Sequence, residues 1–191
     1  MKKSKYLVLN SFYFDFNDDL TEITNVKELF KKQNILDLHR FDILKNIERF
    51  AFKENQIKHL KLPQNIEIID NYSFNKNQIE ILDLSNCINL KNIGEFAFKE
   101  NQIKHLKLPK NVETLSFASF AYNKIQNLDL SNCIKLKNIE EYAFKENQIK
   151  HLKLPKNIKK IELSAFLNNK IEILDLSNCI KLKHIVFDAF S

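Results

Sequence analysis

The sequence contains one glycine, three prolines and no tryptophan in 191 residues. Glycine usually supplies tight turns and the loops whose backbone cradles phosphate groups, so a glycine-rich nucleotide-binding loop is excluded. No apolar run reaches the roughly 18 residues that a membrane-spanning helix requires. Arginine occurs only at Arg40 and Arg49, so lysine carries almost all of the basic charge behind the formal net charge of +6. An AT-rich gene also encodes much lysine, asparagine, isoleucine and phenylalanine, so this charge alone predicts no specific nucleic-acid partner.

Repetition is the dominant feature that is present. The stretch FKENQIKHLKLP occupies residues 52–63 and recurs unchanged at residues 98–109 and 144–155. Pairs of leucines two residues apart recur more widely, at alternating intervals of 24 and 22 residues, and each unit also has an aliphatic residue followed five positions later by phenylalanine. This pattern predicts seven units in residues 33–191, grouped in 46-residue double repeats, with the last unit truncated. The leucine pairs are Leu36/Leu38, Leu60/Leu62, Leu82/Leu84, Leu106/Leu108, Leu128/Leu130, Leu152/Leu154 and Leu174/Leu176.

The repeat predicts a solenoid. A Leu-x-Leu segment is a short strand that points both leucines inward and the residue between them outward. No unit can bury its own apolar face, so neighbouring turns must supply the core. We therefore expect a parallel sheet on one side of the stack and a continuous spine of phenylalanines behind it.

The units resemble the leucine-rich repeat pattern LxxLxLxxN/CxL, with Asn or Cys standing three residues after the second leucine in six units. Stretches such as LKLPKNVETLSFASF and LDLSNCINLKNIGEFAF are most similar to the BspA-like (Treponema-type) subclass. The resemblance covers roughly residues 33–191. It implies an α/β, mainly β solenoid: a right-handed superhelix with a parallel concave sheet and an irregular or short-helical convex side. One departure is consistent, because asparagine replaces the cysteine that the subclass usually carries three residues after the phenylalanine. These positions are Asn55, Asn77, Asn101, Asn123, Asn147 and Asn169.

Residues 1–32 do not fit the repeat. Alternating patterns predict strands at residues 6–9 and 12–16, and helical spacing after a capping box of Asp19 and Glu22 predicts a helix over residues 20–30. We expect this strand–helix segment to be an N-terminal cap. At the other end the repeats stop without a polar cap, so the array either continues in a longer parent or meets a partner there, such as a second copy of the chain.

The candidate ligand-binding residues lie on the outward side of the predicted strands. Aspartate and lysine alternate between the paired leucines, beginning with Asp37, and isoleucine, histidine or asparagine precedes each pair, beginning with Ile35. The candidates are His59, Lys61, Ile81, Asp83, His105, Lys107, Asn127, Asp129, His151, Lys153, Ile173 and Asp175. In the alternative interpretation, the charges only set strand register, since an exposed ion pair contributes about 0–1 kcal/mol.

No metal, cofactor or enzyme site is predicted. His59, His105 and His151 recur on alternate strands, about 9.6 Å apart, which is too far for one zinc ion. The same spacing excludes disulfides among the three cysteines, Cys87, Cys133 and Cys179, which we expect to be buried thiols. The sequence also lacks a phosphate loop, a paired-histidine zinc helix and a nucleophile elbow.

Lysines form a further row after the predicted strands. They could hold an acidic partner or simply be solvated. The row comprises Lys45, Lys91, Lys137 and Lys183, joined by Lys135 and Lys181.

Three functions remain open. The first is a non-enzymatic protein-interaction module that binds a protein ligand on the concave face; the resemblance implies a surface-exposed, adhesin-like role. The second is a structural solenoid that forms homo-oligomers through its C-terminal edge, and the third is binding of an anionic polymer by the lysine rows. The family resemblance implies the cell surface or secretion, whereas the missing apolar stretch of a signal peptide implies the cytoplasm if the chain is complete as given.

Overall fold

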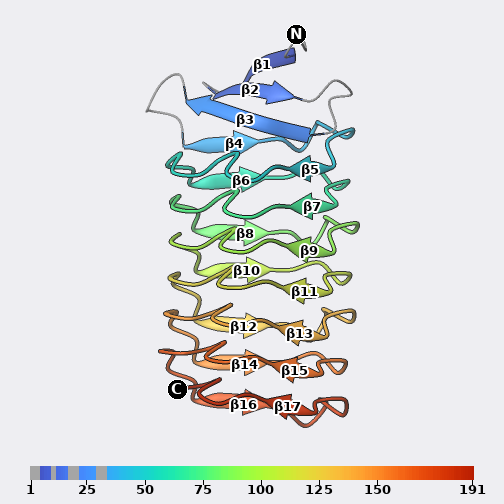
Figure 1. Ribbon diagram of the computed structural model, residues 1–191, viewed down its shortest axis with the longest axis vertical. Helices are drawn as coiled ribbons and strands as arrows, with labels where there is room; N and C mark the ends of the chain where they lie inside the picture. Colours follow the sequence, from blue (N-terminus) through green and yellow to red (C-terminus); the bar gives the residue numbers. More distant parts are fainter. Residues whose placement is uncertain (1–4, 10–11, 17–21, 29–33) are drawn as a thin grey trace.

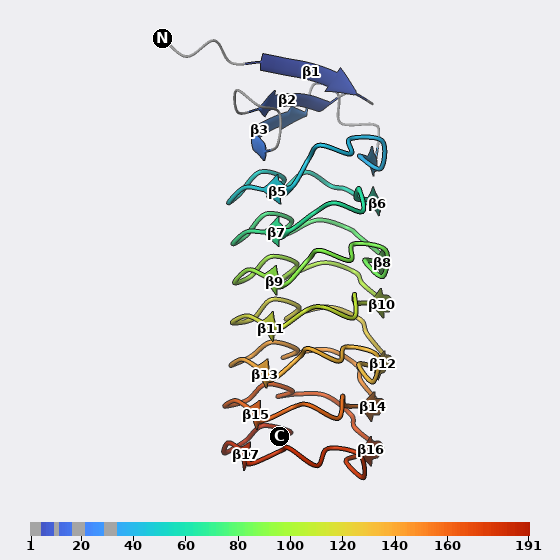
Figure 2. The same cartoon turned by 90° about the vertical axis from the view of Figure 1, so that its right-hand side faces the viewer.

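The computed structural model describes residues 5–9, 12–16, 22–28 and 34–191. From residue 34 onward, each turn of the chain contributes one three-residue strand and one two-residue strand, and the turns stack into a solenoid (Figure 1). The two kinds of strand lie on opposite sides of the stack (Figure 2). This arrangement confirms the predicted solenoid with parallel strands. No helix in the described part of the chain is long and apolar enough to cross a membrane.

The three-residue strands contain the first leucine of each pair, which packs inward while its two neighbours face out. These strands are β4 (Ile35–Asp37), β6 (His59–Lys61), β8 (Ile81–Asp83), β10 (His105–Lys107), β12 (Asn127–Asp129), β14 (His151–Lys153) and β16 (Ile173–Asp175).

The two-residue strands form a second parallel sheet where the resemblance implied an irregular or short-helical side. No helix occurs among residues 34–191, so the short helices expected there are not confirmed. The strands are β5 (Asn46–Ile47), β7 (Ile68–Ile69), β9 (Asn92–Ile93), β11 (Thr114–Leu115), β13 (Asn138–Ile139), β15 (Lys160–Ile161) and β17 (His184–Ile185).

The N-terminal segment continues this second sheet. The expected strands are confirmed as β1 (Lys5–Leu9) and β2 (Phe12–Phe16), but the expected helix over residues 20–30 is wrong, because Glu22–Glu28 forms strand β3. Strand β3 pairs antiparallel with β2 and parallel with β5. A helix would satisfy its own backbone groups but would leave the facing edges of β2 and β5 unpaired. Asp19 of the expected capping box lies outside the described residues, as do residues 29–33 at the expected boundary between cap and repeats. The cap function itself therefore stays a prediction.

The predicted phenylalanine spine runs through the middle of the stack. Six of its rings are fully buried, and neighbouring rings stack nearly parallel, with centroids 5.0 Å apart for Phe52 and Phe74 and 5.5 Å apart for Phe98 and Phe120. Each ring therefore fills the space between the rings of the turns before and after it. The buried rings are Phe52, Phe74, Phe98, Phe120, Phe144 and Phe166.

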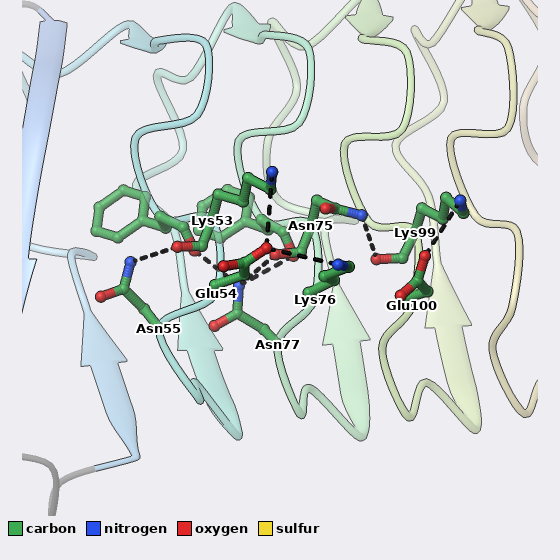
Figure 3. Close-up of polar contacts among 10 residues, drawn as sticks. Lys53, Glu54, Asn55, Asn75, Lys76, Asn77, Lys99 and Glu100 are labelled. Atoms are coloured by element: carbon green, nitrogen blue, oxygen red, sulfur yellow. Dashed lines mark hydrogen bonds and ion pairs between the residues drawn. The ribbon is translucent and has the colours of Figure 1, made fainter.

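Buried asparagines tie each turn to the one before it. The amide oxygen of Asn77 accepts a hydrogen bond from the N–H of Ile57 at 2.9 Å. The amide nitrogen of Asn77 donates to the carbonyl oxygens of Phe52 and Phe74, at 2.7 and 3.0 Å (Figure 3). Asn101, Asn123, Asn147 and Asn169 repeat this pattern. Asparagine thus occupies the position of the subclass cysteine and satisfies backbone groups that the turns leave unpaired.

In the turns, residues other than glycine adopt the left-handed backbone conformation that glycine usually supplies. Among residues 34–191, fourteen non-glycine residues have positive φ angles, including Phe96 at 57° and Lys76 at 56°. The single glycine is used differently: a Cβ atom at Gly94 would lie 2.6 Å from the backbone nitrogen of Asn71, so Gly94 permits two turns to approach closely. The shortage of glycine therefore leaves local strain in the turns.

Replacing Lys76 by glycine should consequently stabilise the protein. We expect the free energy of unfolding to rise by about 0.5 kcal/mol. Glycine has no backbone strain at a positive φ angle, and the loss of this strain outweighs the greater conformational entropy of glycine in the unfolded state. Lys124 is a matched control, since it is also exposed but has no positive φ; its replacement by glycine should lower the free energy of unfolding by about 0.5–1 kcal/mol. Urea unfolding of the two variants measures both changes, and a shift of the same sign in both would contradict the strain argument.

Candidate functional site

The outward side chains of the three-residue strands form one surface, which we call the strand face. It contains Ile35 and Asp37 together with the twelve candidate residues predicted from sequence. Three isoleucines are unusually exposed to solvent for apolar side chains: Ile35 is 52% exposed, Ile81 60% and Ile173 55%. The fold does not need apolar side chains there, since the buried leucine between the two outward residues already supplies the core contact.

The charges on the strand face are grouped in pairs. Lys61 Nζ lies 3.8 Å from Asp37 Oδ2, and Lys107 Nζ lies 3.6 Å from Asp83 Oδ2. In both cases the lysine pairs with the aspartate of the preceding strand. The predicted alternation of charge along the face is therefore present, but it is organised by the 46-residue double repeat.

The aspartates are held in fixed orientations by the residues that follow the strands. Asp129 Oδ1 accepts hydrogen bonds from the hydroxyl and the backbone N–H of Ser131, at 2.6 and 2.9 Å. The Ser131 hydroxyl in particular holds the pKa of the Asp129 carboxyl below its ordinary value. Because the folded-state pKa is the lower one, the stability that this carboxylate contributes is present above its unfolded-state pKa and is lost as the pH falls through its folded-state pKa. The aspartates therefore stay ionised at neutral pH and present fixed negative charge.

The sheet beneath the strand face is interrupted. Strands β4 and β6 pair along all three residues, as do β8 and β10, whereas β6 and β8 pair only at His59 and Ile81. Strands β10 and β12 belong to separate ladders, so the single continuous sheet expected from the repeat is divided into a four-stranded and a three-stranded sheet.

A depression of about 540 Å³ opens where β6 and β8 are loosely paired. It brings together four predicted residues, His59 and Lys61 from β6 and Ile81 and Asp83 from β8, and it is also lined by His39. Sequence reasoning missed His39. The available signal was its position two residues after Asp37, where the equivalent units have serine.

The other predicted site residues continue along the strand face on the C-terminal side of this depression, on β10 to β16. Their outward orientation is the same, with His105, Lys107, His151 and Lys153 all exposed beside a buried leucine. The structure thus arranges the candidates as an elongated surface suited to an extended contact, with one hollow near its N-terminal end.

The cysteines do not form a reactive site. Cys87 is buried and its thiol donates a weak hydrogen bond to the carbonyl oxygen of Pro63 at 3.6 Å. Burial raises the pKa of the Cys87 thiol to about 11 and that of Cys133 to about 12. Both side chains are therefore protonated at neutral pH, and a thiol in that state is a poor nucleophile and metal ligand.

Among residues 34–191, no group of three or more His, Cys, Asp or Glu side chains is arranged to hold a metal ion.

A second aromatic row lies outside the phenylalanine spine and was not predicted. Its rings stack on one another, with centroids 5.0 Å apart for Phe50 and Tyr72 and 4.6 Å apart for Tyr72 and Phe96. Basic side chains lie over some of these rings, such as Arg49 at 4.7 Å from the centroid of Phe50. The row could have been found from the aromatic residues that stand two positions before several spine phenylalanines.

The last turn exposes residues that are buried in the turns before it. Leu174 is 37% exposed and Ile185 is 48% exposed, whereas their counterparts Leu152 and Ile161 are almost completely buried. Phe187 on the same turn is 78% exposed. Homo-oligomer formation through this edge remains a prediction.

Comparison with known proteins agrees with this architecture. The model of the BspA type leucine rich repeat region, in six copies, matches residues 21–135 and 79–191. Among solved structures, a leucine-rich repeat protein from Eubacterium ventriosum ATCC 27560 is similar, with a TM-score of 0.50 and 17% identity over 88% of this chain and 50% of that one. The chain thus spans about half the length of that protein, and the likeness concerns the fold alone. None of the curated proteins gives a significant match. The family match covers most of the sequence, and the chain belongs to the BspA-type leucine-rich repeat family.

Proposed function

We propose that this chain is a non-enzymatic protein-interaction module whose protein ligand binds the strand face. Leucine-rich repeats generally serve as protein-interaction modules. The observation that carries the proposal is the depression between β6 and β8, where the 60% exposed side chain of Ile81 lies beside His59, Lys61 and Asp83. An open apolar side chain with charged neighbours offers both the buried area and the orientation that a protein contact requires.

The shape of the strand face supports a protein ligand over a small molecule. The hollow is shallow and the candidate residues extend along the whole stack, so an elongated partner could contact several strands at once. Isoleucine recurs at the same outward position in β4, β8 and β16. The family resemblance favours one concrete form of this proposal: an adhesin-like role, in which the chain attaches to a host protein or to a neighbouring cell.

A display selection tests the proposal. Proteins or peptides selected on the intact chain are compared for binding to Ile81→Glu and Ile134→Glu. Both isoleucines are exposed, but Ile81 is on the strand face and Ile134 is in the turn after β12. We expect Ile81→Glu to weaken binding at least about tenfold, the size of effect that a central apolar contact has, and Ile134→Glu to leave it unchanged.

The opposite selectivity, or equal binding to both variants, would contradict the strand face as the binding surface. Circular dichroism and urea unfolding of both variants distinguish lost binding from lost folding.

A further inference from the structure

The sheet of two-residue strands carries a column of charged residues whose pattern changes along the stack. The residue before each strand is a lysine at β5, β9, β13 and β17 and a glutamate at β7 and β11. At β15 the expected glutamate is replaced by Lys159. The column therefore reads Lys45, Glu67, Lys91, Glu113, Lys137, Lys159 and Lys183.

The same backbone hydrogen bond recurs along this column. The N–H of Glu67 donates to the carbonyl oxygen of Lys45 at 2.7 Å, and the N–H of Lys159 donates to that of Lys137, also at 2.7 Å. The side chains differ: Lys45 Nζ forms an ion pair with Glu67 Oε1 at 3.1 Å, whereas Lys137 and Lys159 are like charges on adjacent turns. Like charges on neighbouring strands are destabilising. Lys183 extends this row, since its N–H donates to the carbonyl oxygen of Lys159 at 3.0 Å.

Two more lysines enlarge the positive surface. Lys135 and Lys137 are both exposed, and the residue between them, Leu136, is buried. Lys181 and Lys183 repeat this arrangement in the last turn. We call these five residues the C-terminal lysine cluster: Lys135, Lys137, Lys159, Lys181 and Lys183.

The nearby glutamates do not neutralise the cluster. Glu162 forms an ion pair with Lys160, at 2.5 Å, and is therefore already engaged. Glu113 lies on the N-terminal side of Lys137, outside the run of three lysines.

We propose that the C-terminal lysine cluster binds a linear polyanion, a polymer of closely spaced phosphate or sulfate groups. Neighbouring strands are about 4.8 Å apart, so the three lysines of the column form a row that such a polymer can follow. An ammonium group acts as a compact point charge, which suits phosphate and sulfate oxygens. The cluster itself contains no aromatic ring, whereas proteins that retain single-stranded nucleic acid stack its bases on aromatic side chains. This surface is separate from the strand face, and the proposal does not depend on the proposed function.

The repeats themselves supply the test variants. Lys159→Glu restores the charge alternation found at Glu67 and Glu113, and Glu113→Lys extends the row of lysines by two turns. Binding of long-chain inorganic polyphosphate and of heparin is measured by fluorescence anisotropy over a range of salt concentrations. We expect Lys159→Glu to weaken binding about tenfold or more and to flatten the salt dependence, because fewer counterions are released on binding. Glu113→Lys should strengthen binding several-fold.

Lys124→Glu is the control, because it makes the same change of net charge at an exposed position before β12. It should change the affinity less than about twofold, as expected where no polymer charge is contacted directly. The polymer that binds more tightly identifies phosphate or sulfate as the preferred group. Equal weakening by Lys159→Glu and Lys124→Glu, or the absence of binding to both polymers at low salt, would overturn the proposal. Ile81→Glu should leave polyanion binding intact, so failure here is distinguishable from failure of the strand face.

Discussion

Replacing Phe120 by alanine is expected to lower the free energy of unfolding by about 3–5 kcal/mol. Phe120 is completely buried, and its ring stacks on Phe98 at 5.5 Å and on Phe144 at 5.4 Å. Its removal leaves a cavity in the middle of the spine and takes a stacking partner from both neighbouring turns. Because turns of a solenoid are stabilised by their neighbours, we expect the loss to weaken the contacts on both sides of the cavity.

Phe187 provides the matched control for Phe120. It is 78% exposed, so its replacement by alanine should change the free energy of unfolding by less than about 0.5 kcal/mol. Urea unfolding followed by far-UV circular dichroism measures both variants. Similar stability losses in the two would mean that the phenylalanine spine is not what holds the turns together.

Replacing Asn123 by alanine is expected to lower the free energy of unfolding by about 2–4 kcal/mol, because buried backbone groups lose their hydrogen-bond partner. Asn123 accepts a hydrogen bond from the N–H of Ile103 at 3.0 Å and donates to the carbonyl oxygens of Phe98 and Phe120, both at 3.0 Å. Alanine can replace none of these bonds, and water has little access to a site where the side chain is only 6% exposed.

Two further variants, Asn89→Ala and Asn123→Asp, serve as comparisons for Asn123→Ala. Asn89→Ala removes an exposed side chain and should change the stability by less than about 0.5 kcal/mol. Asn123→Asp keeps the shape but places a carboxylate against two carbonyl oxygens, so it should be more destabilising than Asn123→Ala at pH 7. If Asn123→Ala unfolds at the same urea concentration as Asn89→Ala, the asparagine hydrogen bonds do not stabilise the stack.

The repeated core was predictable because its chemistry is periodic. Leucines at fixed intervals and a phenylalanine in every unit require an inward strand and a spine, and the structure confirms both. The outward positions of the strand-face residues followed from the same alternation, since a residue beside a buried leucine in a strand must face out.

The N-terminal strand β3 shows where local pattern misleads. Residues 22–28 combine helical spacing with the β-branched residues Ile23, Thr24 and Val26, which are also suited to a strand. The pairing partners decide between the two, and these lie at β2 and at β5, whose residues 46–47 are more than twenty positions along the chain. A single-sequence pattern contains no information about that contact.

The depression on the strand face could not be predicted for a related reason. Residues 59–61 and 105–107 have identical sequences, yet β6 pairs with β8 at one position and β10 shares no ladder with β12. The strand sequence alone therefore does not determine how far each strand pairs with the next. The left-handed turns could not be predicted from the sequence either. Residues such as Phe96 and Lys76 do not favour positive φ and adopt it only under the constraint of the stack.

Histidine modification tests most directly whether the strand face binds the protein ligand. The chain has five histidines; His59, His105 and His151 lie on the strand face, His39 lines the depression, and His184 belongs to β17 in the opposite sheet. Diethyl pyrocarbonate labelling followed by mass spectrometry is compared for the chain alone and with a ligand from the display selection. We expect His39 and His59 to be protected by the ligand and His184 to react equally in both samples. Protection of His184 with full reactivity of His59 would show that the ligand binds elsewhere on the solenoid.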